Sequence, residues 1–245
     1  MRYLTLLFLI SCGWAQTVKN AADPRAGLCP GVLAAIYGTN LAPMTEASDY
    51  VPRPVTLGGI RVRVTDSAKQ TRLAPLSYAS PDQINFEIPE DSALGPATVA
   101  IENPRHPVSV RIEIEKIAPA LFAADRSGIA AATAVRVIFP SLDKTPVSVY
   151  ECRGAQCRLT PMSQQIDSTI YISLFGTGIR GVSTLADVTV NIGGRQVTPT
   201  YAGSQLDSPG EQRIDFPLPR DLHGELTASV TIDGITSNAV RLRVE

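Results

Sequence analysis

The stretches IYGTNL (36–41) and LFGTGI (174–179) share one pattern, and this pattern decides how the chain is organised. In each stretch an apolar run stops at a glycine, and an apolar residue returns three positions later. The residue just before that return is Asn40 in the first stretch and Gly178 in the second, two types that tolerate a left-handed backbone. We therefore expect a strand end, a left-handed turn residue and a return to the core at both places.

Further matches show that a whole unit is written twice. QINFEIP (83–89) resembles RIDFPLP (213–219), and VRIEI (110–114) resembles VRLRV (240–244). These matches indicate a duplicated unit of roughly 90–100 residues, in which the first copy carries about eight additional residues. We place the additional residues in the loop 42–54.

Both units have the pattern of β-structure. GGIRVRV (58–64) and ADVTVNIGG (186–194) alternate apolar and polar residues, and turn residues separate such runs at short intervals. The Ala-rich stretch 126–137 carries Thr133 and two valines, which favour a strand over a helix. About seven short strands per unit predict an all-β chain of two tandem immunoglobulin-like β-sandwiches.

Alternation within the repeated strands predicts which side chains face the core. The expected inward sets are Ile84, Phe86 and Ile88 in the first copy and Ile214, Phe216 and Leu218 in the second. We also assign Tyr37 and Phe175 to the core. Pro217 cannot donate a ladder hydrogen bond, so we expect its strand at a sheet edge or at a bulge.

The composition is that of an ordinary globular protein with enough apolar material for a core. The 245 residues carry a net charge of −1, with 44% hydrophobic and 18% charged residues. No cluster of Lys and Arg is present, which argues against a nucleic-acid partner because phosphate binding needs a local surplus of positive charge.

The first residues, MRYLTLLFLISCGWAQ, have the three parts of a secretory signal peptide. Gly13 and Ala15 stand at the −3 and −1 positions for cleavage before Gln16, so we assign residues 1–15 to the signal peptide. No later run approaches the ~20 apolar residues of a membrane helix, and we expect an exported mature chain without a transmembrane segment. The alternative is a lipobox, LISC, in which Cys12 is lipidated and anchors the protein to the envelope.

Export makes disulfide formation possible. Cys152 and Cys157 enclose RGAQ, with Gly154 near the middle, and we predict a hairpin closed by a disulfide. Cys29 is then left over, either as a buried free thiol or, alternatively, as half of an intermolecular bridge.

Four stretches together indicate a protein family: GVLAAIYGTNL (31–41), LGGIRVRV (57–64), LSYASPDQINFEIP (76–89) and GPATVAI (95–101). They resemble the secreted TIG (IPT)-like domain of acidobacteria, the Solibacter-type uncharacterised C-terminal domain. The resemblance implies immunoglobulin-like sandwiches in an exported protein. It implies no reaction, because no role is established for that family.

No catalytic constellation is visible in the sequence. There is no Gly-x-Ser-x-Gly elbow, and His106 and His223 stand alone in turn-like polar stretches. We therefore predict no catalytic residue, no metal and no cofactor. Binding usually resides in loops on a rigid sandwich, and Tyr50 and Tyr150 are the loop aromatics that we predict as contact residues.

The expected organisation is a first sandwich over 17–118, a connector over 119–128 and a second sandwich over 129–245 that includes the Cys152–Cys157 hairpin. We predict an exported, non-enzymatic binding or structural module with an unknown protein or glycan partner at the cell surface. It would act through loop contacts or strand addition. The alternatives are a lipid-anchored envelope subunit and a secreted hydrolase.

Overall fold

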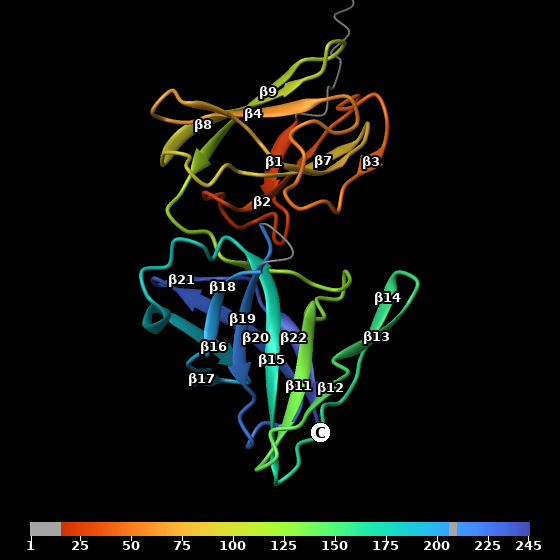
Figure 1. The fold of residues 1–245 in the computed structure, drawn as a ribbon, viewed down its shortest axis with the longest axis vertical. Coiled ribbons are helices and arrows are strands. Elements are labelled where there is room, and N and C mark those ends of the chain that lie inside the picture. The colour runs from red at the N-terminus through yellow and green to blue at the C-terminus, as the bar shows by residue number, and fades with distance from the viewer. Residues whose placement is uncertain (1–15, 206–209) are drawn as a thin grey trace, which may run out of the picture.

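The protein consists of two β-sandwiches that lie end to end (Figure 1). The computed structural model describes residues 16–205 and 210–245. Within these residues the only helical segment is one 3₁₀ turn, η1 (Leu185–Asp187), and all other regular elements are strands. The expected all-β class with two tandem immunoglobulin-like sandwiches is confirmed. Cys12 and the predicted signal peptide 1–15 lie outside the described residues.

The first sandwich packs a five-stranded sheet, in the order β1-β2-β7-β6-β3, against a four-stranded sheet, in the order β5-β4-β8-β9. Every pairing between these strands is antiparallel. The strands are β1 (Thr17–Asn20), β2 (Leu33–Tyr37), β3 (Glu46–Ala47), β4 (Arg61–Thr65), β5 (Thr71–Leu73), β6 (Leu76–Ala79), β7 (Gln83–Glu87), β8 (Gly95–Glu102) and β9 (Val108–Ile114).

The second sandwich has the same two layers. One sheet has the strand order β12-β11-β15-β19-β18, and β10 also pairs with β15. The other sheet has the strand order β17-β16-β20-β21, and β22 also pairs with β20. Strands β13 and β14 form a separate hairpin. The strands are β10 (Ala120–Leu121), β11 (Ala132–Ile138), β12 (Lys144–Val147), β13 (Tyr150–Arg153), β14 (Gln156–Leu159), β15 (Ser168–Thr177), β16 (Val188–Ile192), β17 (Arg195–Val197), β18 (Tyr201–Ser204), β19 (Gln212–Pro217), β20 (Gly224–Ile232), β21 (Ile235–Thr236) and β22 (Val240–Val244).

The duplication extends to the strand register. Ile36 pairs with Ile84 in the first sandwich, and the corresponding Leu174 pairs with Ile214 in the second. Ala34 pairs with Phe86, as Ile172 pairs with Phe216. All of these side chains are buried in the cores of their own sandwiches, which confirms the predicted inward sets.

The repeated turn has the predicted geometry in both copies. Asn40 has φ 56° and Gly178 has φ 76°, so both residues adopt the left-handed conformation. Leu41 and Ile179 then return to the core, where both are fully buried.

Two aromatic assignments and one strand assignment differ from the expectation. Tyr37 is 44% exposed, and Phe175 is half-buried on the outer face of its sheet, because Ile36 and Leu174 already occupy the inward positions next to them. Pro217 lies on β19, which is an interior strand. It is tolerated there because it is the last residue of β19, and the neighbouring β18 reaches only to Tyr201, opposite Asp215.

The segment expected as a connector, 119–128, contributes to the second sandwich. β10 pairs with β15, and Leu121 is buried in the second core. The boundary between the cores falls between neighbours, since Ile117 packs into the second core and Ala118 into the first. Because Ile117 and Ala118 are consecutive residues buried in different cores, no free linker separates the two domains.

Candidate functional site

The junction between the sandwiches is held by a buried hydroxyl. The backbone N–H of Leu33 donates to Thr177 Oγ1 at 2.9 Å, and this hydroxyl donates to the carbonyl of Gly210 at 3.0 Å. Thr177 is fully buried, whereas Thr39, which occupies the same place in the first copy of the motif, is exposed. The second copy therefore uses a repeated residue to fasten the two domains together.

The same turn explains why the second copy carries glycine where the first has asparagine. A Cβ on Gly178 would collide with the carbonyl oxygen of Ala118. The N–H of Ala118 donates to the carbonyl of Gly178 at 3.1 Å. Glycine is therefore required here by the close approach of two backbones, in addition to its positive φ.

Charged and amide side chains brace the junction on one side. Arg180 of the second domain forms an ion pair with Glu90 of the first and donates two hydrogen bonds to Ser204 Oγ. Gln212 Oε1 accepts from the N–H groups of Ile179 and Arg180, which fixes the turn that carries the arginine. A guanidinium held in this way loses little further entropy when it pairs across the junction.

A buried carboxyl group lies under the same contact. Glu87, the residue opposite Leu33 in the register of β2 and β7, is only 4% exposed. Burial raises its pKa above the usual value, and the positive charges of Arg180 and Arg53 offset part of this rise. The Glu87 carboxyl group is therefore desolvated at this place.

A groove of about 330 Å³ opens beside this junction, and we call it the junction groove. The outer face of β2, β6 and β7 lines it from the first domain, the 42–54 loop forms one wall, and the second domain supplies the other. Its lining residues are Ala21, Leu33, Ala35, Tyr37, Ser48, Asp49, Arg53, Ser77, Gln83, Asn85, Phe122 and Glu211.

The polar side chains of the groove floor are oriented by one another. Tyr37 and Gln83 lie directly opposite in the register of β2 and β7, and Asn85 is the next outward residue on β7. Gln83 Nε2 donates to Asn85 Oδ1 at 2.7 Å. This bond uses one donor of Gln83 and the amide oxygen of Asn85, so Gln83 Oε1 can still accept and Asn85 Nδ2 can still donate to a ligand.

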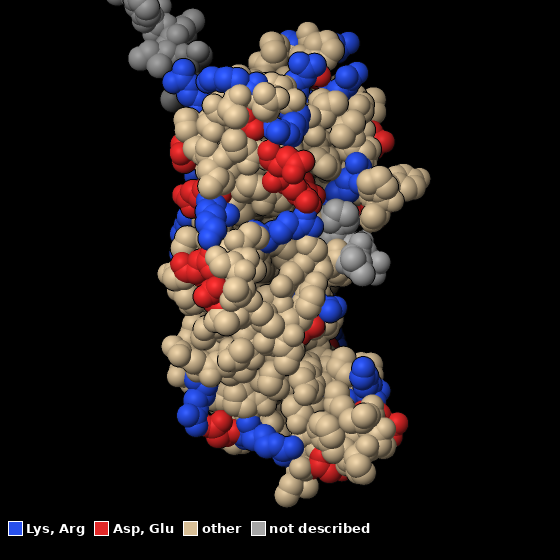
Figure 2. Space-filling model, turned by 60° about the vertical axis from the view of Figure 1, so that its left-hand side comes forward, with Lys and Arg blue, Asp and Glu red and all other residues tan. Residues whose placement is uncertain are grey.

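Charge is distributed without a dominant sign. Figure 2 shows acidic and basic side chains interspersed over the visible face, with both signs present at mid-height, where the domains meet. The groove itself contains Asp49, Glu211 and Arg53, one cation against two carboxylates. Such a site does not attract polyanions.

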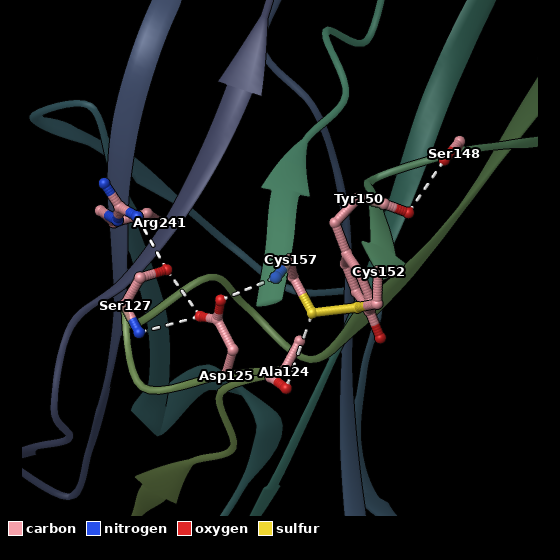
Figure 3. Close-up of a disulfide and its surroundings, with 8 residues drawn as sticks. All are labelled: Ala124, Asp125, Ser127, Ser148, Tyr150, Cys152, Cys157 and Arg241. Atoms are coloured by element: carbon pink, nitrogen blue, oxygen red, sulfur yellow. Dashed lines mark hydrogen bonds between the residues drawn. A yellow bond between two sulfur atoms is a disulfide. The ribbon is translucent and has the colours of Figure 1, made fainter. Parts of the chain in front are cut away.

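The predicted disulfide is present. Cys152 and Cys157 are bonded and lie opposite each other in the β13–β14 hairpin, with Gly154 at φ 61° in the turn between them. Figure 3 shows Asp125 directed at Ser127 and at the backbone of Cys157. Hydrogen bonds from the Ser127 hydroxyl and the Cys157 N–H lower the pKa of Asp125, so this carboxylate ties the hairpin to the body of the second domain.

A second cleft, of about 480 Å³, lies between this hairpin and the 125–127 turn. Glu151 and Arg158 are opposite each other in the hairpin register and both line it. This cleft belongs to one domain, and one of its walls is a two-stranded hairpin. We regard the junction groove, with walls from both domains, as the better defined site.

The structure places the other predicted residues as follows. Tyr50 is 79% exposed in the 42–54 loop, whose Ser48 and Asp49 line the junction groove. Tyr150 is half-buried against the second core at the start of β13, so it lies in the other domain and apart from the groove. Cys29 is a buried free thiol, and burial raises its pKa to about 12.

Sequence reasoning missed the residues that build the groove. The outward positions of QINFE carry two amides, and this signal could have drawn attention to β7. Phe122 and Glu211 could not be found, because they reach the groove only through domain packing. In the described part of the chain, no group of three or more His, Cys, Asp or Glu side chains could hold a metal ion. Over the same residues, no helix has the length and apolar character to cross a membrane.

Comparisons with known proteins give weak matches only. No protein-family model and no curated protein matches the chain. Among solved structures, the plexin A4 extracellular region is 12% identical with a TM-score of 0.27 over 94% of this chain, which spans 18% of the plexin chain. A titin tandem of immunoglobulin domains (13%, TM-score 0.23, 89% of each chain) and bovine butyrophilin (9%, TM-score 0.23, 93% of this chain and 98% of that one) are similar at the same level. The fold is assigned from the sheets described above.

Proposed function

We propose that this protein is an exported, non-enzymatic binding module whose ligand lies in the junction groove. The observation that carries the proposal is the construction of the groove from two domains fixed by the buried Thr177 contact and the Arg180–Glu90 ion pair. Walls held in this way are preorganised, so a ligand does not have to order them when it binds.

The side chains in the groove are suited to recognition. Tyr37 offers an aromatic face, and Gln83 and Asn85 offer hydrogen-bonding groups that do not change protonation near neutral pH. Small residues such as Ala35 and Ser77 leave room between them. A shallow floor with a few directed polar groups is the usual composition of a ligand site.

The cellular setting and the family are parts of the same proposal. The Cys152–Cys157 disulfide supports export, because such bonds persist in oxidising compartments. The TIG-like assignment rests on the resemblance of the sequence stretches given above. Intact-mass analysis of the mature protein tests the setting: a chain beginning at Gln16 supports a secreted form, and a lipidated Cys12 supports the envelope-anchored alternative.

An affinity-capture experiment tests the role of the groove. The immobilised protein is incubated with envelope and culture-supernatant fractions of the native organism, and the retained material is quantified. Ser77→Arg places a long side chain on the groove floor, and Ser109→Arg places the same side chain on β9, in the other sheet of the first domain. We expect Ser77→Arg to abolish capture and Ser109→Arg to retain it; equal capture by both variants would refute the proposal.

A further inference from the structure

We propose that the ligand of the junction groove is a neutral glycan chain, an inference that rests on the function proposed above. The inference follows from the hydrogen-bonding, aromatic and charged groups that the groove presents to a ligand. Three features carry it: a floor without available backbone groups, an aromatic side chain beside a fixed amide pair, and walls without a surplus of positive charge.

The floor strands have no backbone groups to offer to a peptide. β2 lies between β1 and β7, and β7 lies between β2 and β6, so the ladder hydrogen bonds of both strands are made within the sheet. Strand addition needs an open edge. A ligand on this face is therefore recognised by side chains, which suits a molecule whose own polar groups are hydroxyls.

Tyr37 and the amide pair match the two sides of a sugar. A pyranose ring has an apolar C–H face, which packs on an aromatic ring such as the exposed Tyr37. Its neighbouring hydroxyls each act as donor and acceptor. The linked amides of Gln83 and Asn85 present one acceptor and one donor from adjacent outward positions of β7, as two neighbouring hydroxyls require.

The walls select against negative charge and suit a chain rather than a single sugar. Asp49 and Glu211 outnumber Arg53, which disfavours acidic polysaccharides. Phe122 adds a second aromatic side chain from the opposite domain. A site with one aromatic residue on its floor and another on its far wall spans more than one ring of a linear polymer.

The test uses the capture assay with chemically treated fractions of the native envelope. Mild periodate cleaves vicinal diols and destroys glycan ligands, whereas protease destroys protein ligands. We expect capture to be lost after periodate, to survive protease, and to fall at least tenfold in Tyr37→Ala. Tyr171→Ala is the matched control, because Tyr171 lies on the outer face of β15, the strand of the second domain that corresponds to β2, and this variant should bind as the native protein does.

The expected carbohydrate passes an anion exchanger at low salt without retention. Capture that survives periodate but not protease, captured carbohydrate that the exchanger retains, or capture unaffected by Tyr37→Ala in a variant with the native unfolding midpoint would each overturn the inference. The proposed function fails separately, through equal capture by Ser77→Arg and Ser109→Arg. A protein ligand that Ser77→Arg excludes would refute the glycan while leaving the groove as the binding site.

Discussion

Thr177→Val removes one hydroxyl from the junction and leaves the side-chain shape almost unchanged. In the native protein this hydroxyl accepts from the Leu33 N–H and donates to the Gly210 carbonyl. Without it, both backbone groups lose their partners in a buried place. Each such group costs about 1–3 kcal/mol, so a closed junction is destabilised by about 2–6 kcal/mol.

The best readout is amide hydrogen exchange at a residue that the substitution does not touch. The Ala118 N–H, from a residue buried in the first core, donates to the Gly178 carbonyl of the second domain, so it becomes accessible when the junction opens. A loss of about 2 kcal/mol corresponds to roughly 30-fold faster exchange. We expect at least this acceleration in Thr177→Val, together with a lower urea midpoint.

Thr39→Val is the internal control for this experiment. It changes the same residue of the same repeated motif, but Thr39 is exposed, whereas Thr177 is the residue whose hydroxyl accepts the Leu33 N–H across the junction. Its exchange and urea midpoint should stay at native values. If Thr177→Val also stayed within about twofold of the native exchange rate at Ala118, the buried hydroxyl would not hold the domains together, and the preorganised groove would lose its main support.

Three other groups, two buried and one crosslinked, can be tested in the same way. Burial raises the pKa of Glu87 above its usual 4.5. The stability that the protonated Glu87 carboxyl contributes is therefore fully present below pH 4.5 and is lost as the pH rises through the folded-state pKa. Glu87→Gln should raise the urea midpoint at pH 7 and leave it unchanged well below pH 4.5, and a lower midpoint at pH 7 would contradict this. Burial raises the pKa of Cys29 to about 12, so its thiol should resist iodoacetamide at about pH 8 until the chain is unfolded. Mass spectrometry measures the modification, and modification of the folded protein would argue against the burial of Cys29. The disulfide between Cys152 and Cys157 closes a short loop and stabilises the hairpin by about 2 kcal/mol. Replacing both cysteines by serine should therefore accelerate amide exchange in β13–β14 roughly 30-fold and leave the urea midpoint at its native value. A large fall in that midpoint would mean that the hairpin supports the whole domain.

Local sequence patterns determined most of the architecture. The alternation of QINFEIP and RIDFPLP placed Phe86 and Phe216 in the two cores, and the IYGTNL and LFGTGI turns fixed where the strands end. The short spacing of Cys152 and Cys157 was enough to predict the crosslinked hairpin. These features depend on neighbours one to five residues away, which a sequence displays directly.

The same patterns were ambiguous where apolar residues ran without interruption. In LAAIY and ISLF every position is apolar or small, so the sequence did not show which alternate set faces inward. The structure puts Ile36 and Leu174 in the cores and leaves Tyr37 and Phe175 on outer faces. This one-residue difference moved Tyr37 from the expected core into the groove.

By itself, then, the sequence determined that one sandwich is written twice, where its strands lie and which cysteines pair. Only the tertiary structure decided that Thr177 rather than Thr39 is buried, that Glu87 is desolvated, and that Phe122 and Glu211 face Tyr37 across a groove. The reason is physical: strand alternation and turn geometry arise from bonds between near neighbours, whereas a domain junction depends on two finished surfaces, built from segments more than a hundred residues apart, meeting in one orientation.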